Sequence, residues 1–326
     1  MRLGWLSKLF GKNPPASAPA IQPVINRDFP DPNVLAVGSE YYAYSTNSMY
    51  DGSLIRLPMF RATALAGPWV GAGEGMPEAA GWVADAGHGG PCIWAPEVAA
   101  AGEGYLLYYT ARHAAHQVQC LGVAASDGPG GPFRPVGTDA LIVEPAEGDT
   151  IDAEAFTDTD GTRYLIYKSG RTRSTMWLRK LSQDGRALDG DRVEILRSDR
   201  PEEANIVEAP TLVRHNDSYV LFYSANTFSS GTYFVNYAIA PAIGGPYTKQ
   251  PGALLTTDTI HGAYRNPGHQ DVVAGPDGDY LVFHASIDQT RRGMFVVGLD
   301  WTADGHPTVT LDRPARVPAE PDLSSL

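Results

Sequence analysis

The 326-residue sequence has few cysteines, no cluster of basic residues and no long apolar run. Cys92 and Cys120 are its only cysteines, which excludes a disulfide framework and allows one bridge at most, so we expect two partly buried free thiols. The 25 lysine and arginine residues form no run and the net charge is -12, which argues against nucleic-acid binding. No window approaches the roughly 20 apolar residues that cross a bilayer. A neutral ligand fits this composition better.

The N-terminal stretch MRLGWLSKLFGKNPPASAPA is basic, briefly apolar and then rich in proline and alanine. Lys8 and Lys12 interrupt its apolar residues, and the run is shorter than the central region of a usual signal peptide. We therefore expect residues 1–24 to form a flexible segment and residues 25–326 to form one domain. Without a clear signal peptide, a cytoplasmic location is favoured.

Sustained helical periodicity is also missing, whereas 35 glycines, 26 prolines and 16 tyrosines suit short aromatic strands joined by turns. One aromatic strand pattern occurs five times, at intervals of 64, 59, 55 and 61 residues: YYAYST, YLLYYTA, YLIYKS, YVLFYSA and YLVFHAS. Each unit has room for about four short strands, and radial repetition of such sheets is the propeller architecture. The sequence predicts an all-β, five-bladed β-propeller; a large β-sandwich, the alternative, requires no repeat of this length.

One ionisable residue precedes each aromatic phrase by 8 to 12 residues. These residues are Asp31, Glu97, Asp152, Glu208 and His269. Each alone has an ordinary structural explanation, as a turn, solvated or core residue. Their recurrence at one phase predicts that they approach a common axis, where gathered carboxylates are costly and indicate a reaction site. Carboxylates on non-adjacent blades suit glycoside hydrolysis, in which an acid and a base act on opposite sides of the sugar, and this spacing favours inversion.

Several phrases then carry a family resemblance: FPDPNV, WAPEV, IDAEAFTDTDGTRYLIYK, VEAPTLV, NPGHQDVV and RRGMFVVGLDWTADGHP. In this order they resemble family 43 of the glycoside hydrolases, five-bladed propellers with inverting action on arabinose- and xylose-containing polysaccharides. The resemblance implies that Asp31 is the general base, Glu208 the general acid and Asp152 the third carboxylate, which raises the pKa of the acid. It also places a sugar-contacting arginine at Arg292, with Arg291 as the adjacent alternative.

His269 matches a histidine that many family members place beside a central calcium ion. Calcium takes mainly oxygen ligands, so water or carboxylates would complete such a site; the alternative is a histidine that caps a buried network. Asp271, two residues later on a strand, should share its face. Glu97 could reach the axis, although a structural role is more common at that position.

Aromatic rings stack on sugars, and Phe29 and Trp94 are the candidates for this contact, whereas Trp82, Phe156 and Phe228 are expected to pack within the blades. The glycine-rich segment 71–91 is expected to close one end of the pocket, with a surface loop as the alternative.

The predicted activity is the exo-acting, inverting release of terminal xylose or arabinose from short oligosaccharides, as a β-xylosidase or α-L-arabinofuranosidase. An endo-α-1,5-L-arabinanase is the competing prediction, because an open cleft in place of a closed pocket would accept a chain. A sugar-binding propeller without catalysis would not need three carboxylates. The sequence leaves the oligomeric state open.

Overall fold

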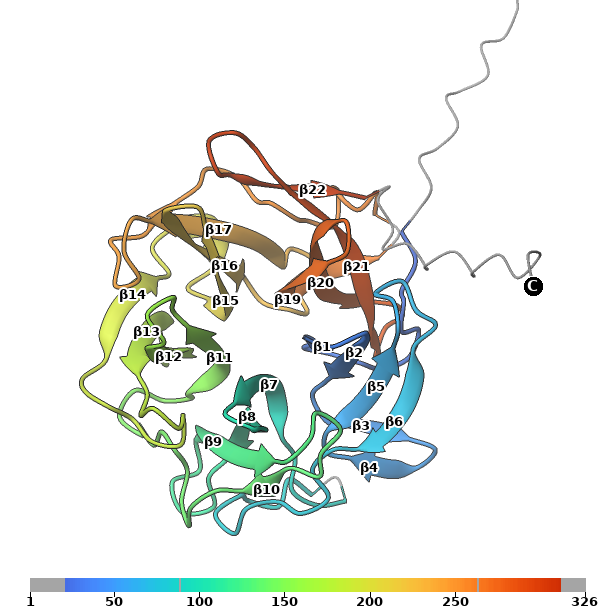
Figure 1. Ribbon diagram of the computed structural model, residues 1–326, viewed down its shortest axis with the longest axis vertical. Helices are drawn as coiled ribbons and strands as arrows, with labels where there is room; N and C mark the ends of the chain where they lie inside the picture. The colour runs from blue at the N-terminus through green and yellow to red at the C-terminus, as the bar shows by residue number, and fades with distance from the viewer. Residues whose placement is uncertain (1–20, 88, 263, 312–326) are drawn as a thin grey trace, which may run out of the picture.

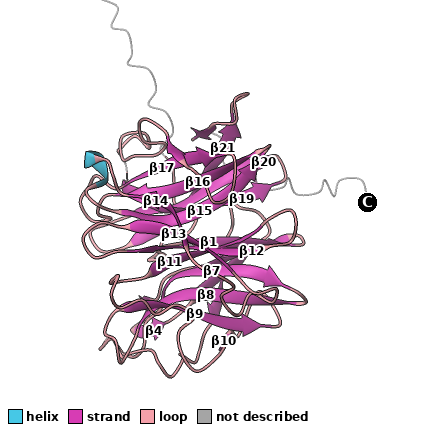
Figure 2. Cartoon of the chain, turned by 90° about the vertical axis from the view of Figure 1, so that its left-hand side faces the viewer, coloured by secondary structure: helices cyan, strands magenta, loops and turns pink. Residues whose placement is uncertain are grey.

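The computed structural model describes residues 21–87, 89–262 and 264–311, which form five four-stranded antiparallel sheets around a central axis (Figure 1). The described residues contain one short helical turn, the 3-10 helix η1 (Pro201–Glu203), and are otherwise strands and connections (Figure 2). Within them no helix is long and apolar enough to cross a membrane. The all-β, five-bladed prediction is confirmed.

Each blade is built from one continuous stretch of chain, with its first strand innermost. Blade 1 contains β1 (Asn33–Val37), β2 (Glu40–Tyr44), β5 (Pro58–Ala62) and β6 (Val70–Glu74), and carries the hairpin β3 (Ser48–Tyr50) and β4 (Ser53–Ile55). Blade 2 contains β7 (Trp94–Ala101), β8 (Gly104–Arg112), β9 (Gln119–Ser126) and β10 (Arg134–Pro135). Blade 3 contains β11 (Ile151–Thr157), β12 (Arg163–Ser169), β13 (Thr175–Lys180) and β14 (Val193–Arg197). Blade 4 contains β15 (Val207–His215), β16 (Ser218–Ala225), β17 (Phe234–Ala240) and β18 (Thr248–Lys249). Blade 5 contains β19 (Arg265–Gly275), β20 (Gly278–Ser286), β21 (Arg292–Trp301) and β22 (Pro307–Thr310).

The aromatic phrases form the second strand of every blade, where both faces are covered by neighbouring blades. In β8, Leu107 and Tyr109 belong to the core shared with blade 1, whereas Leu106 and Tyr108 belong to the core shared with blade 3. Alternate side chains of a strand point to opposite faces, so one short apolar run supplies two cores. Five such cores separate the five blades.

The ring is closed by the segment that precedes β1. Val24 donates a backbone hydrogen bond to the Met294 carbonyl (2.8 Å), and Phe29 donates one to the Arg292 carbonyl (2.7 Å) in β21. Ile21 is buried in the core of blades 4 and 5. Of the segment expected to be flexible, Ile21 and Val24 thus pack on the propeller, and residues 1–20 lie outside the described residues.

A β-bulge interrupts the ladder of four inner strands near its start. The register shifts between Trp94 and Glu97, Ile151 and Glu154, Glu208 and Thr211, and Gly268 and Asp271. The second residue of each bulge has a positive φ, as does Asp31 just before β1: Asp31 56°, Ala95 44°, Asp152 58°, Ala209 52° and His269 48°. Bulges re-aim side chains, and here they do so at the same level of every blade.

Candidate active site

A pocket of about 370 Å³ lies at the centre of the face where the inner strands begin, which we call the upper face. Its lining comes from all five blades: Asp31, Thr46, Trp94, Ala95, Ile151, Asp152, Glu208, Phe228, Tyr233, His269, His284 and Arg292. Pockets of this volume hold small ligands. The opposite face, or lower face, carries the turns between first and second strands.

The structure brings six of the predicted residues to this pocket: Asp31, Trp94, Asp152, Glu208, His269 and Arg292. Glu97 is not among them. The bulges show that Glu97 lies two residues beyond Ala95, the blade 2 counterpart of Asp31 and Asp152. The predicted common phase was therefore wrong for Glu97, whose blade carries alanine at this level. It was also off by one residue for Glu208, which precedes Ala209 in its bulge but lines the pocket.

The bulges are held by hydrogen bonds that cross from one blade to the next. Thr46 accepts from the amide of Ala95 (2.8 Å), Thr110 from Asp152 (3.2 Å), Ser224 from His269 (2.8 Å) and His284 Nδ1 from Asp31 (3.1 Å). Thr110, Ser224 and His284 lie on second strands opposite the bulges of their own blades, and Thr46 follows the end of β2, opposite Pro30. All four stand near the ends of the aromatic phrases.

Blade 3 differs because Lys168 occupies the acceptor position, opposite Ile151. A lysine ammonium group cannot accept a hydrogen bond. The amide of Ala209 donates instead to Oδ2 of Asp152 (3.0 Å). Asp152 therefore positions the backbone that carries Glu208, and Lys168 is free to contact Glu208 at 3.9 Å.

Sequence reasoning missed Thr46, Lys168, Tyr233 and His284. Three of them stand in the quoted aromatic phrases, where polar residues near the ends of YYAYST, YLIYKS and YLVFHAS break the apolar pattern. Those polar interruptions were the available signal.

Asp31 is surrounded by donors. Arg292 donates to Oδ1 (3.0 Å), Thr46 donates to Oδ2 (2.6 Å), and His269 Nδ1 lies 3.4 Å from Oδ1. Burial alone would raise the pKa of Asp31, but the charges of Arg292 and His269 outweigh it and hold that pKa well below its ordinary value. Burial lowers the pKa of His284 to about 4, so its ring is neutral at pH 7. Asp31 is thus ionised, as a base or nucleophile must be.

The pKa of Glu208 is shifted in the opposite direction to that of Asp31. Burial, and then the neighbouring Asp152 carboxylate, raise the pKa of Glu208 to about 7, against the lowering effects of Lys168 and of the Tyr233 hydroxyl, which donates to Oε1 (2.9 Å). Burial also raises the pKa of Asp152, opposed by His269 and Lys168. Glu208 can therefore hold a proton near neutral pH while Asp31 stays ionised, the division of labour that acid–base glycoside hydrolysis requires.

Arg292, and not Arg291, enters the pocket. Its backbone N–H donates to Asp28 Oδ1 (3.1 Å) while its guanidinium reaches Asp31. Arg291 is exposed and pairs with Asp288 in a turn (2.6 Å). Asp28 thus has a structural role, as its place in a proline-rich turn indicates.

Of the two aromatic residues predicted to contact the sugar, only Trp94 lies at the pocket. Trp94 lines the pocket and is 41% exposed, whereas Phe29 is 0% exposed and packs edge-on against Phe60. The prediction that Phe29 flanks the sugar is wrong, because the chain turns its ring into the core between blades 5 and 1. Phe228, which was expected to pack within a blade, is instead 50% exposed, lines the pocket and lies beneath the Arg292 guanidinium at 5.1 Å.

Segment 71–91 does not line the pocket in its described residues. Its first residues complete β6, and Met76, Ala80, Trp82 and Val83 are buried in the core of blades 1 and 2. The expectation that it closes the pocket is not met, because these apolar residues anchor it to the side of the ring.

A second ring of polar residues lies one layer deeper in the channel, at the last position of each bulge. Asn33 donates to Glu97 (2.7 Å) and to Asp271 (3.3 Å), and Glu154 accepts from the amide of Leu212 (3.1 Å). Asp271 therefore points inwards below His269. Burial, together with the neighbouring acids, raises the pKa values of Glu97 and Glu154 well above normal.

The oxygen atoms of this second ring determine whether a calcium ion could bind beside His269. Within the described residues, no three histidine, cysteine or acidic side chains are arranged to hold a metal. The oxygen atoms below His269 are already engaged in hydrogen bonds with the backbone and with Asn33. His269 could therefore serve a calcium ion only if water supplied most of the ligands, and the ion would supply positive charge beside Asp31.

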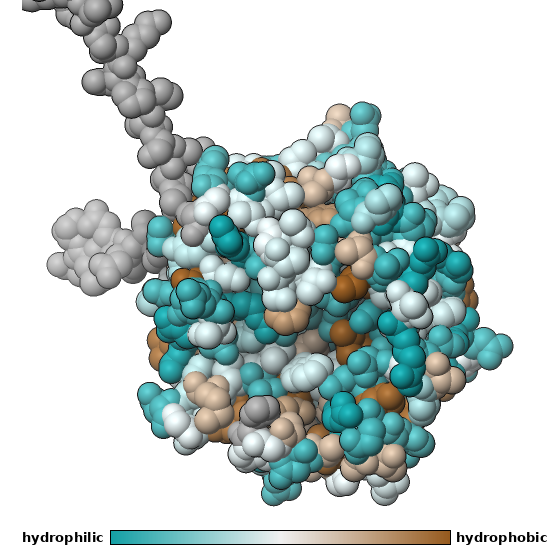
Figure 3. All heavy atoms as spheres, turned by 180° about the vertical axis from the view of Figure 1, so that it is seen from behind, coloured by the Kyte–Doolittle hydropathy of each residue, from teal (hydrophilic) through white to brown (hydrophobic). Residues whose placement is uncertain are grey.

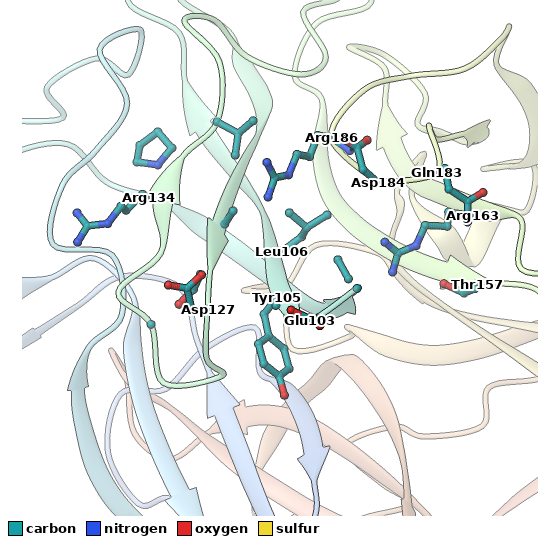
Figure 4. Close-up of a pocket in the computed structure, with 18 of the residues that line it drawn as sticks. Glu103, Tyr105, Leu106, Asp127, Arg134, Thr157, Arg163, Gln183, Asp184 and Arg186 are labelled. Atoms are coloured by element: carbon teal, nitrogen blue, oxygen red, sulfur yellow. The ribbon is translucent and has the colours of Figure 1, made fainter.

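A larger hollow lies elsewhere on the described surface. It measures about 1340 Å³, lies on the lower face between blades 2 and 3, and includes Arg134, Arg163 and Arg186 (Figure 4). It contains none of the predicted site residues.

The view from behind in Figure 3 shows a mostly hydrophilic face with scattered apolar areas. Cys92 and Cys120 are free thiols, as expected, with Cys120 buried.

Comparison with known proteins agrees with this geometry. The chain is 31% identical over 186 residues to the β-D-galactofuranosidase xynD of Aspergillus niger (55% of this chain, 51% of that one). It is 27% identical to the extracellular endo-α-(1→5)-L-arabinanase 1 of Bacillus subtilis (64% and 67%) and 27% identical to xylosidase/arabinosidase 43B of Humicola insolens (85% and 51%). The chain thus spans about half the length of two of these relatives.

Among solved structures, a thermostable family-43 glycoside hydrolase superposes with a TM-score of 0.77 at 26% identity, covering 92% of this chain and 98% of that one. An endo-1,4-β-xylanase from Bacteroides thetaiotaomicron superposes with a TM-score of 0.75 at 25% identity, covering 89% and 97%. The family "Glycosyl hydrolases family 43" matches residues 20–307. The chain therefore belongs to family 43 of the glycosyl hydrolases.

Proposed function

We propose that the protein is an exo-acting, inverting glycoside hydrolase that releases terminal xylose or arabinose from oligosaccharides. The observation that carries the proposal is the pairing, in one small pocket, of an ionised Asp31 with a Glu208 whose pKa is raised to about 7. Asp31 acts as general base on water, Glu208 protonates the departing oxygen, and Asp152 raises the pKa of Glu208 and fixes its backbone. Arg292 orients Asp31, and Trp94 and Phe228 offer rings to the sugar.

The exo-acting assignment rests on pocket volume, since about 370 Å³ suits one or two sugar units. An endo-α-1,5-L-arabinanase is the second candidate. One observation favours it: a hollow of about 640 Å³ between blades 4 and 5 shares Tyr233 with the pocket, so a chain could continue beyond it.

The test uses nitrophenyl β-xyloside, nitrophenyl α-L-arabinofuranoside and debranched arabinan. Release of nitrophenol from either glycoside supports the exo reaction, whereas medium-length products from arabinan without nitrophenol release would favour the endo reaction. Proton NMR of the first-formed sugar should show an inverted anomer; a retained anomer would make Asp31 a nucleophile. Asp31→Asn and Glu208→Gln should each lower kcat by about 10²–10⁴, with circular dichroism showing an intact fold.

The proposal includes a calcium ion beside His269, with water as its other ligands. Chelation should lower activity and added calcium restore it, and His269→Ala should abolish the response to both. Equal rates with chelator and with calcium would leave His269 a structural role.

A further inference from the structure

The upper face carries a strongly basic hollow beside the catalytic pocket. It measures about 680 Å³ and is lined from blades 2, 3 and 4, with Arg112, Lys168, Arg171 and Arg173 as its cationic residues and Asp149 as its acidic one. This concentration of positive charge stands out in a chain with a net charge of -12.

The three arginines are available to a ligand. Arg112 donates to the side chain of Gln117, Arg171 donates to the Pro145 carbonyl, and all three arginines are exposed. Within the described parts of the chain, none of the three forms an ion pair with a carboxylate. Guanidinium groups that pair with no protein carboxylate can bind the carboxylate of a ligand, because two parallel N–H groups match the two oxygens.

The hollow lies on the side of the pocket where the leaving group departs. Lys168 lines it and lies 3.9 Å from Oε2 of Glu208. The general acid must touch the oxygen that leaves, so the sugar attached to that oxygen lies beyond Glu208. On this side Arg171 and Arg173 lie in the turn between β12 and β13 and line the hollow.

We infer that this hollow is a subsite for a uronic acid, a sugar bearing a carboxylate, carried on the unit next to the terminal pentose. The inference rests on the proposed function, since the direction of the leaving group follows from Glu208 as the acid. Attraction between exposed charges is screened by salt, so the preference should weaken as ionic strength rises.

The test compares a xylo-oligosaccharide that carries a glucuronic acid branch on its penultimate unit with the methyl ester of the same compound. At low ionic strength the wild type should show a kcat/KM about tenfold higher for the acid, as charge-assisted hydrogen bonds give, and about 0.5 M salt should remove most of the difference. The Arg171→Ala/Arg173→Ala double variant should lose the preference but keep its rate on nitrophenyl glycosides. Arg186→Ala, an exposed arginine on the lower face, is the matched control and should behave as wild type.

Equal rates for the acid and the ester in the wild type would overturn the inference, as would a preference that persists in the double variant. Calorimetric binding of the two oligosaccharides repeats the comparison without turnover. It therefore decides on the subsite even if both nitrophenyl glycosides are refused and the proposed function fails.

Discussion

The Lys168 ammonium group lies 3.9 Å from Oε2 of Glu208, at the position where the other four blades carry Thr46, Thr110, Ser224 and His284. Those four side chains accept an amide hydrogen bond from the next blade, and Asp152 performs that task for blade 4. Blade 3, which departs from the pattern of the other four blades, therefore supplies the lysine that contacts Glu208, the residue whose pKa is raised to about 7.

The first prediction concerns the pH dependence that follows. Activity should fall as pH rises through about 7, where Glu208 loses its proton. Because Lys168 lowers the pKa of Glu208, Lys168→Met should move this alkaline limb to higher pH, whereas Asp152→Asn, which removes the raising charge, should move it to lower pH. Profiles of kcat/KM against pH test both directions, and a shared direction would contradict the electrostatic account.

The second prediction concerns Thr46, which donates to Asp31 and accepts from Ala95. Thr46→Val keeps the shape but leaves the amide of Ala95 without its acceptor, so the free energy of unfolding should fall by about 1–3 kcal/mol. The rate should fall about tenfold as Asp31 loses its orientation. Thr46→Ser retains the hydroxyl and should restore both; a serine variant as poor as the valine variant would point to packing instead.

The third prediction separates the two phenylalanines. Phe29→Ala empties a fully buried site and should cost about 3–5 kcal/mol of stability with little effect on KM in the folded fraction. Phe228→Ala removes an exposed ring and should raise KM about tenfold with an unchanged melting temperature. Denaturant unfolding and steady-state kinetics on both variants make the comparison, and a raised KM for Phe29→Ala alone would reverse the assignment.

The fourth prediction concerns the deeper ring of acids. Burial and the charge of Asp271 raise the pKa of Glu154 in the folded protein, so the folded state holds a proton that the unfolded state releases above the ordinary value of 4.5. Stability should therefore fall as pH rises from about 4.5 through the raised pKa. Glu154→Gln should melt at a higher temperature than wild type at about pH 8 but not at about pH 4.5.

The matched control for this prediction is Glu103→Gln, which changes an exposed glutamate in the turn after β7. It should shift the melting temperature equally little at both pH values. A gain for Glu154→Gln of the same size at both pH values would mean that Glu154 remains ionised in the fold. Chelator should be present in all samples, so that bound cations do not mask the effect.

The sequence predicted the blades and the positions of Asp31, Asp152 and Glu208 in the pocket, because aromatic repeats and acidic motifs are local signals. It placed Glu97 at the wrong level because the phase was counted back from the aromatic phrase, and the range of 8 to 12 residues is wider than the two residues that separate Glu97 from Ala95. It predicted that Phe29 is at the pocket and Phe228 in the core, whereas Phe29 is buried and Phe228 lines the pocket. The exposure of a ring depends on which neighbouring segment covers it, and the sequence does not show this. The roles of Lys168 and Tyr233 depend on a partner in another strand or blade, which no single phrase reveals.

Closure of the ring has a consequence for how the protein loses activity. The segment that binds β21 ends directly before Asp31, and Arg292 at the start of β21 contacts both Asp28 and Asp31. Asp31 and Arg292 come from opposite ends of the described chain, so they meet only while the first and last blades stay in contact. If Asp31 is the base, as proposed, separation of the first and last blades should abolish turnover even while every blade remains folded.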